Sequence, residues 1–159
     1  MIKDFNNYLN QLDEVLKNPI AVNWSQKDID SWIGDFNINN IEYEITIENI
    51  SKKQKLFLFK FTANSSYKLV NDIKSSLITI PTVENAAKEF INDTNPDAFL
   101  FFALDESRSR KRFYTDFCQK YKNGYEFKEF TLGMYHFYVL FNDKVDNKDF
   151  NDSINKIIK

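Results

Sequence analysis

A two-residue alternation of apolar and polar side chains in the first half of the chain limits it to folds with a half-buried sheet. Residues 41–48 read Ile-Glu-Tyr-Glu-Ile-Thr-Ile-Glu, so the apolar members share one face and the acidic members share the other. Asn39 and Asn40 precede this segment, and asparagine tolerates the positive φ of a tight turn. We therefore expect strands 32–38 and 41–48 to form a hairpin with one face on a core.

Further periodic segments predict four more strands and four helices. Residues 55–63 and the apolar run 98–104 predict strands, and residues 125–130 and 134–141 predict a second hairpin that turns through Thr131–Gly133. Helical spacing predicts helices over 4–17, from a cap at Thr82 to about Ile91, over 106–122 with Gly124 past its end, and over 147–158.

Two segments are left open by their patterns. Trp24 is expected to anchor either a loop or a short edge strand. Between residues 64 and 80, Tyr67–Val70 and Leu77–Ile80 fit either short strands or an extended loop.

The order of these elements predicts an α+β fold, written α-β-β-β-α-β-α-β-β-α. One antiparallel or mixed sheet of about six strands, with helices packed mainly on one face, accommodates that order. A length of 159 residues without a shift in composition favours one domain over 1–159. Within it we expect an amino-terminal helix in 1–18, a core over 32–141 and a carboxyl-terminal helix over 147–158.

Charge and cysteine content disfavour several classes of protein. The net charge of -2 and the pI near 5.5 argue against a general nucleic-acid binder, since such domains are usually basic. Cys118 is the single cysteine, which excludes an internal disulfide and a multi-cysteine metal site within one chain. The sequence contains no run of about 18 apolar residues and no secretory signal at its start, so we expect a cytoplasmic or virion location and no membrane partner.

The stretch from Asp97 to Tyr114 holds the candidate ligand site. Ser107, Arg108, Lys111 and Arg112 follow a buried strand, and a hydroxyl, free backbone N–H groups and cations at a helix start suit a small anion or nucleotide. Arg108, Lys111 and Arg112 share one helix face, from which Arg110 points away. The competing interpretation is that Arg108 pairs with an acid and fixes the helix to the sheet, and we favour it.

The other residues that could take part in catalysis or metal binding are better explained by structural roles. His136, the sole histidine, lacks partners for catalysis or metal binding, and Cys118 lacks an activating base. Asp35, Glu42, Glu44 and Glu48 line a solvated strand face rather than a metal site, and their charge opposes a nucleic-acid platform built on Trp24 and Trp32. We expect no catalytic residue, no metal and no cofactor.

A resemblance to known proteins rests on Thr82–Phe90, Pro96, the run Phe101-Phe-Ala-Leu-Asp-Glu-Ser-Arg108, Lys111 and Tyr114. It resembles small uncharacterised bacteriophage-type proteins with a strand-to-helix signature, Phe-x-Ala-x-x-Glu-Ser-Arg-x-x-x-Tyr, and covers about residues 32–141. The resemblance implies a phage-related context and the same order of elements, and it implies no activity. We therefore expect a non-enzymatic protein that binds a phage or host protein, as a virion component or a modulator of the host or its defences. The alternative is a domain that binds a small anion or nucleotide at Ser107 and Arg108.

Overall fold

The computed structural model describes residues 19–64, 73–104, 108–122 and 124–158, without the side chains of 73–77, 108 and 109. The predicted helix over 4–17 and the segment Tyr67–Val70 lie outside these ranges. Within them the chain forms a seven-stranded sheet and three helices, so the predicted α+β class is confirmed.

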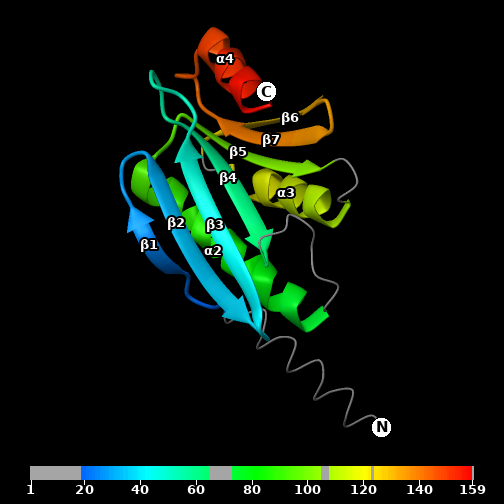
Figure 1. The fold of residues 1–159 in the computed structure, drawn as a ribbon. Helices are drawn as coiled ribbons and strands as arrows, with labels where there is room; N and C mark the ends of the chain where they lie inside the picture. The colour runs from blue at the N-terminus through cyan, green and yellow to red at the C-terminus, as the bar shows by residue number, and fades with distance from the viewer. Residues whose placement is uncertain (1–18, 65–72, 105–107, 123, 159) are drawn as a thin grey trace.

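The sheet is mixed, because one pair of neighbouring strands is parallel and the others are antiparallel. Its order is β1-β2-β3-β4-β5-β7-β6, and the parallel pair is β4 with β5 (Figure 1). The strands are β1 Asn23–Lys27, β2 Ser31–Ile38, β3 Ile41–Asn49, β4 Leu56–Ala63, β5 Ala98–Leu104, β6 Glu126–Leu132 and β7 Tyr135–Phe141.

The first hairpin forms as its alternation predicts. Asn39 and Asn40 have φ angles of 52° and 66°, the positive values that a two-residue turn between twisted strands requires. Tyr43, Ile45 and Ile47 of β3 are buried, whereas Glu42 and Glu44 are exposed. The side-chain period therefore fixed both the register and the buried face.

The extra strand β1 is the main departure from the predicted six-stranded sheet. It pairs antiparallel with β2, and its register shifts between Trp24 and Gln26. Trp24 packs over Gly34 of β2 so closely that a Cβ at residue 34 would lie 2.6 Å from the indole Cε3. The glycine makes room for the indole, and Trp24 therefore anchors an edge strand rather than a loop.

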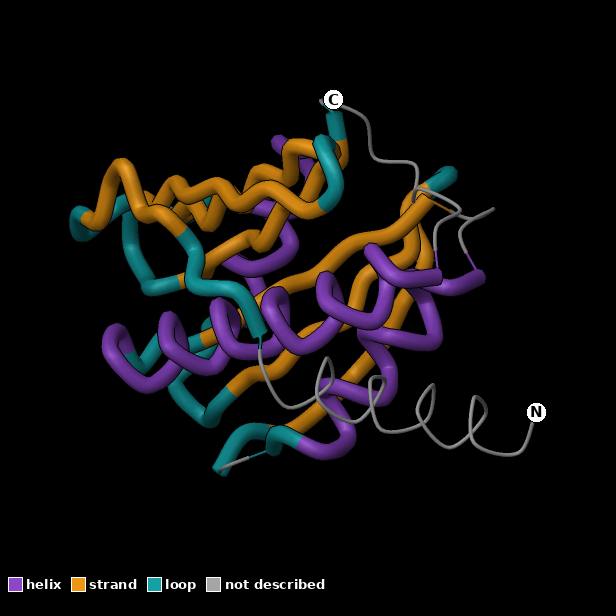
Figure 2. Tube along the Cα trace, turned by 90° about the horizontal axis from the view of Figure 1, so that it is seen from below, coloured by secondary structure: helices purple, strands orange, loops and turns teal. Residues whose placement is uncertain are grey.

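Helices cover both faces of the sheet. On one face, α2 (Ile73–Thr94) and α3 (Arg108–Lys120) bury an aromatic-rich core that includes Phe59, Phe90 and Phe101. On the other face, α4 (Asn147–Ile157) buries a second core beneath Phe150 and Ile154. Figure 1 shows α2 behind β2 and β3 with no helix in front of them, and Figure 2 shows the helices lying along the strands. The predicted placement of helices mainly on one face thus holds for two of the three.

Helix α2 begins nine residues before the predicted cap at Thr82. The Thr82 hydroxyl lies inside the helix, where it donates to the Ile78 carbonyl at 2.8 Å and accepts from the Ile20 N–H at 3.0 Å. The expectation of a strand or loop at Leu77–Ile80 was therefore wrong. The helix contains Pro81, which lacks an N–H, and continues through it.

Smaller differences concern the ends of two other elements. The β6–β7 turn falls at Gly133 and Met134, with Gly133 at a φ of 60°, rather than at Thr131–Gly133. Thr131 and Leu132 instead pair with residues of β7. Helix α3 spans Arg108–Lys120, and Gly124 has the left-handed φ of 89° expected past its end.

Candidate functional site

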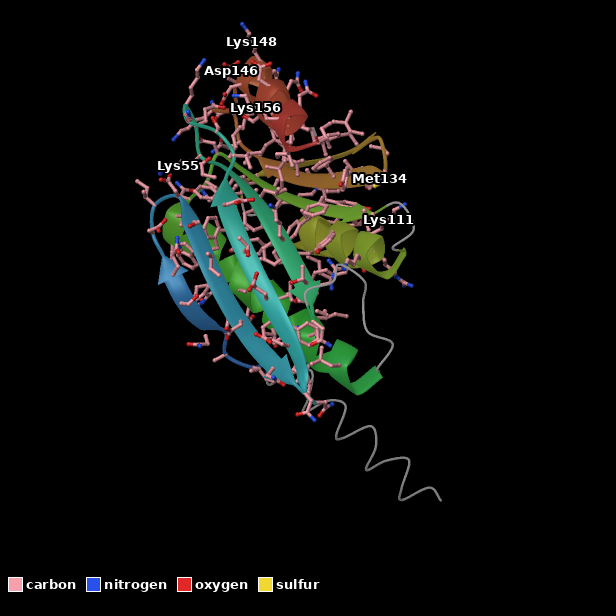
Figure 3. The ribbon with its side chains drawn as sticks, viewed as in Figure 1. Lys55, Lys111, Met134, Asp146, Lys148 and Lys156 are labelled. Carbon is pink, nitrogen blue, oxygen red and sulfur yellow. The ribbon has the colours of Figure 1, made fainter. Side chains whose placement is uncertain are left out.

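The four predicted anion-site residues are only partly within the described structure. Ser107 lies outside the described residues, and Arg108 begins α3 without a described side chain. Lys111 is half-buried and Arg112 is exposed. Figure 3 shows Lys111 at the start of α3, at the same end of the molecule as Met134 in the β6–β7 turn. Two of the four side chains thus lie outside the described structure, and the predicted site stays a hypothesis.

Arg110, which is not one of the four predicted residues, is buried in the structure. Its exposed fraction is 5%. Its Nη1 donates a 2.7 Å hydrogen bond to the Phe61 carbonyl, and the guanidinium carbon lies 4.8 Å from the centroid of the Phe61 ring. As predicted, Arg110 points away from the face that Lys111 and Arg112 share. Its side chain points into the core.

The remaining donors of Arg110 are not satisfied by the described part of the chain. Nε and Nη2 are both shielded from solvent, and neither has a hydrogen-bond partner there. The ion pairs that the structure describes join Lys27 to Glu89 and Lys60 to Glu48, on other elements. An arginine stays protonated in proteins, so this position carries a buried positive charge.

Tyr114 lies one helical turn after Arg110 and is also fully buried. Burial raises the pKa of the Tyr114 hydroxyl, and the positive charge of Arg110 acts in the opposite direction. The Tyr114 ring stacks on Phe101 of β5, with centroids 4.6 Å apart. Tyr114 therefore stays neutral beside Arg110 and does not provide a counter-charge for it.

Helical spacing is the signal that could have identified Arg110. Tyr114, Phe117 and Cys118 form the buried stripe of α3, and Arg110 lies four residues before Tyr114 on that stripe. A dense run of cations obscured the pattern, because such runs usually lie on a solvated face. The spacing also loosens the phage-type resemblance, since five residues rather than three separate Arg108 from Tyr114.

His136 and Cys118 occupy structural positions in this fold. The His136 Nδ1 lies 2.9 Å from the Thr131 hydroxyl across the β6–β7 pair, as expected for a strand histidine with a neighbouring partner. Cys118 is fully buried, and burial raises the pKa of its thiol. A thiol held in its neutral form is a poor nucleophile.

The predicted solvated acidic face is present on the open side of β2 and β3. Asp35 pairs in register with Glu44, and Asn37 with Glu42, on the side that α2 does not cover. No cluster of three or more His, Cys, Asp or Glu side chains among the described residues is arranged to hold a metal ion. Trp32 is buried in the core, so it offers no stacking surface to a base.

A groove runs between α4 and β6 on the face that α4 covers. It has a volume of about 460 Å³. It is lined by both apolar and polar residues: Lys128, Glu129, Phe130, Leu132, Phe150, Asn151, Ile154 and Asn155. The Lys128 ammonium lies 4.4 Å from the Phe150 ring centroid and 5.1 Å from that of Phe141, so its charge is drawn over aromatic rings.

Comparison of the chain with protein-family models, curated proteins and solved structures gave no significant match. Within the described ranges, none of the helices combines the length and apolar character needed to cross a bilayer.

Proposed function

We propose that this protein acts by binding another protein, as a virion component or as a modulator of the host or its defences. The phage-related context rests on the resemblance of the Phe101–Arg108 stretch to phage-type proteins. The observation that carries the binding function is the edge strand β6, which lies beside the groove under α4. An edge strand with an adjacent groove can accept an extended segment of a partner as an additional strand.

The two edges of the sheet differ in how well they are protected. β1 is five residues long, has a register shift, and is tied to α2 by the 2.9 Å ion pair of Lys27 with Glu89. β6 is seven residues long and pairs with β7 without a shift. Natural sheets usually protect their edges with short or irregular strands, and β1 fits that description better than β6. The longer, regular edge is therefore the better surface for strand addition.

The groove supplies the sites that would give such binding its specificity. A strand added beside β6 would direct every second side chain toward α4, where the half-buried Phe130 and Leu132 offer apolar surface. Lys128 lies among these residues and would favour an acidic side chain at one position. The expected partner segment is extended, alternates apolar residues, and carries one acid.

The test is binding of a displayed random-peptide library, followed by hydrogen exchange of the protein with a selected peptide. We expect enrichment of extended apolar peptides and slower amide exchange across Glu126–Leu132, with no change in β1. Asn155→Arg places a long cation in the groove and should abolish binding. Asn85→Arg makes the same change at an exposed position of α2 and should leave binding intact.

Two results would contradict this function. Protection of amides elsewhere with β6 unchanged would place the binding surface on another element. Equal binding by the Asn155→Arg and Asn85→Arg proteins would show that the groove does not contact the peptide. Circular dichroism of both variants, which change exposed side chains, establishes that each retains its fold.

A further inference from the structure

The guanidinium of Arg110 carries a buried positive charge, and Arg110 does not line the groove between α4 and β6. It is 5% exposed, and two of its nitrogens lack partners within the described part of the chain. Burial of a charge without a partner is costly, and buried charges are normally paired. We propose that Arg110 is the central residue of a binding site for a small oxyanion, a carboxylate or a phosphate group.

The two nitrogens of Arg110 without hydrogen-bond partners, Nε and Nη2, are the pair that binds such an anion in a bidentate manner. The N–H groups of Nε and one Nη2 lie on one edge of the planar guanidinium and point in parallel directions. Carboxylate and phosphate oxygens accept this fork in a bidentate manner, with short, charge-assisted hydrogen bonds. Nη1 is already engaged by the Phe61 carbonyl at 2.7 Å, and this bond fixes the plane of the group. The N–H groups of Nε and Nη2 are therefore held in a fixed orientation for bidentate binding.

The position of Arg110 in the fold adds to its positive potential. β4 and β5 are parallel, and their pairing ends at Phe59 with Phe101, although both strands continue beyond these residues. Arg110 reaches the Phe61 carbonyl in the part of β4 that β5 no longer pairs with. It belongs to the first turn of α3, where the helix dipole also favours an anion.

The surroundings of the guanidinium strengthen an interaction with an anion. Phe61 presents its ring at 4.8 Å and Tyr114 is fully buried, so the site is largely shielded from water. A charge pair in such surroundings is screened less than one in water. The site thus differs from that predicted at Ser107 and Arg108, because its donor is a core residue whose orientation the structure fixes. It is independent of the protein-binding groove.

Thermal unfolding in chloride, phosphate, sulfate and acetate buffers of equal ionic strength tests this site. We expect phosphate or acetate to raise the melting temperature above its value in chloride, in a manner that saturates with concentration. A larger response to phosphate and sulfate would identify a phosphoryl-type ligand, and a larger response to acetate a carboxylate. Arg110→Met should remove the response. Arg112→Ala, which removes an exposed cation of the same helix, should keep it.

A second measurement reads the site directly in the wild-type protein. The chain contains three arginines, at 108, 110 and 112, so ¹⁵N-arginine labelling gives at most three Nε signals. Phosphate or acetate titration should shift the signal that Arg110→Lys removes, and the lysine variant, which keeps the charge without the fork, should lose most of the thermal response. Equal melting temperatures in all four buffers with an unmoved Nε signal would overturn the proposal. A full response in Arg110→Met would overturn it as well.

Discussion

The side chain of Arg110 contacts Phe61 in two ways. Its Nη1 donates to the Phe61 carbonyl at 2.7 Å, and its guanidinium carbon lies 4.8 Å from the centroid of the Phe61 ring. Backbone and side chain of β4 thus hold a cation from α3 at the place where β4 separates from β5. This contact joins the first turn of the helix to the sheet without any described carboxylate.

Substitution of Gly34 tests the packing that creates β1. Gly34→Ala should lower the free energy of unfolding by about 1–3 kcal/mol, since overpacking a filled site forces its neighbours to move. The new Cβ would meet Trp24 Cε3 and Val22 Cγ1, both at 2.6 Å. Denaturant unfolding measures the loss, and a change in tryptophan fluorescence reports the displaced indole. An unchanged midpoint, equal to that of the exposed-site control Asn37→Ala, would be inconsistent with this packing.

The strands with a clear side-chain period could be predicted from sequence. β5 was predicted with its observed bounds, because an apolar run of seven residues between breakers leaves few alternatives. Glu42 and Glu44 were placed on the solvated face for the same reason. β1 could not be predicted with certainty, since five residues whose position depends on contact between Trp24 and Gly34 carry little local pattern.

Two sequence predictions were wrong because tertiary contacts override the local sequence pattern: the start of α2 and the environment of Arg110. Thr82 predicted a helix start, yet α2 runs through it, with the Thr82 hydroxyl bonded to the Ile78 carbonyl. At the candidate site, cations in a row suggested a solvated helix face. Arg110 instead follows the buried stripe of α3, where its guanidinium lies against the Phe61 ring.

The first hairpin offers a test of the backbone at Asn40. Its φ is 66°, and the left-handed region costs glycine nothing and other residues more. Asn40→Gly should therefore raise the free energy of unfolding by a few tenths of a kcal/mol, whereas Asn40→Val should lower it by about 1–2 kcal/mol. Chemical denaturation of the two variants checks the order. A valine variant as stable as the wild type would contradict this turn.

Buried tyrosines predict a loss of stability at alkaline pH. Burial raises the pKa of Tyr114 and Tyr125, and it raises the pKa of Tyr138 to about 12, from an ordinary value of 10.0. Below pH 10 these groups are neutral in both states and have no effect. Above it the unfolded chain releases their protons first, so the free energy of unfolding should fall between pH 10 and 12.

Absorbance at 295 nm provides the measurement for this prediction. In the folded protein these buried tyrosines should ionise later than the exposed ones, and in denaturant all should ionise together near pH 10. Urea unfolding at successive pH values then gives the stability. A single folded-state titration near pH 10, with stability constant to pH 12, would be incompatible with the burial described for Tyr138.

The most direct test of the unpaired cation is the stability of Arg110→Met in a buffer free of oxyanions. Methionine fills a similar volume and removes the buried charge, at the cost of leaving the Phe61 carbonyl without its donor. If Arg110 has no internal counter-charge, the free energy of unfolding should stay within about 1 kcal/mol of the wild-type value or exceed it, because the removed charge offsets the lost bond. A loss of about 3–5 kcal/mol would contradict the account, since that is the cost of breaking a buried ion pair within the chain.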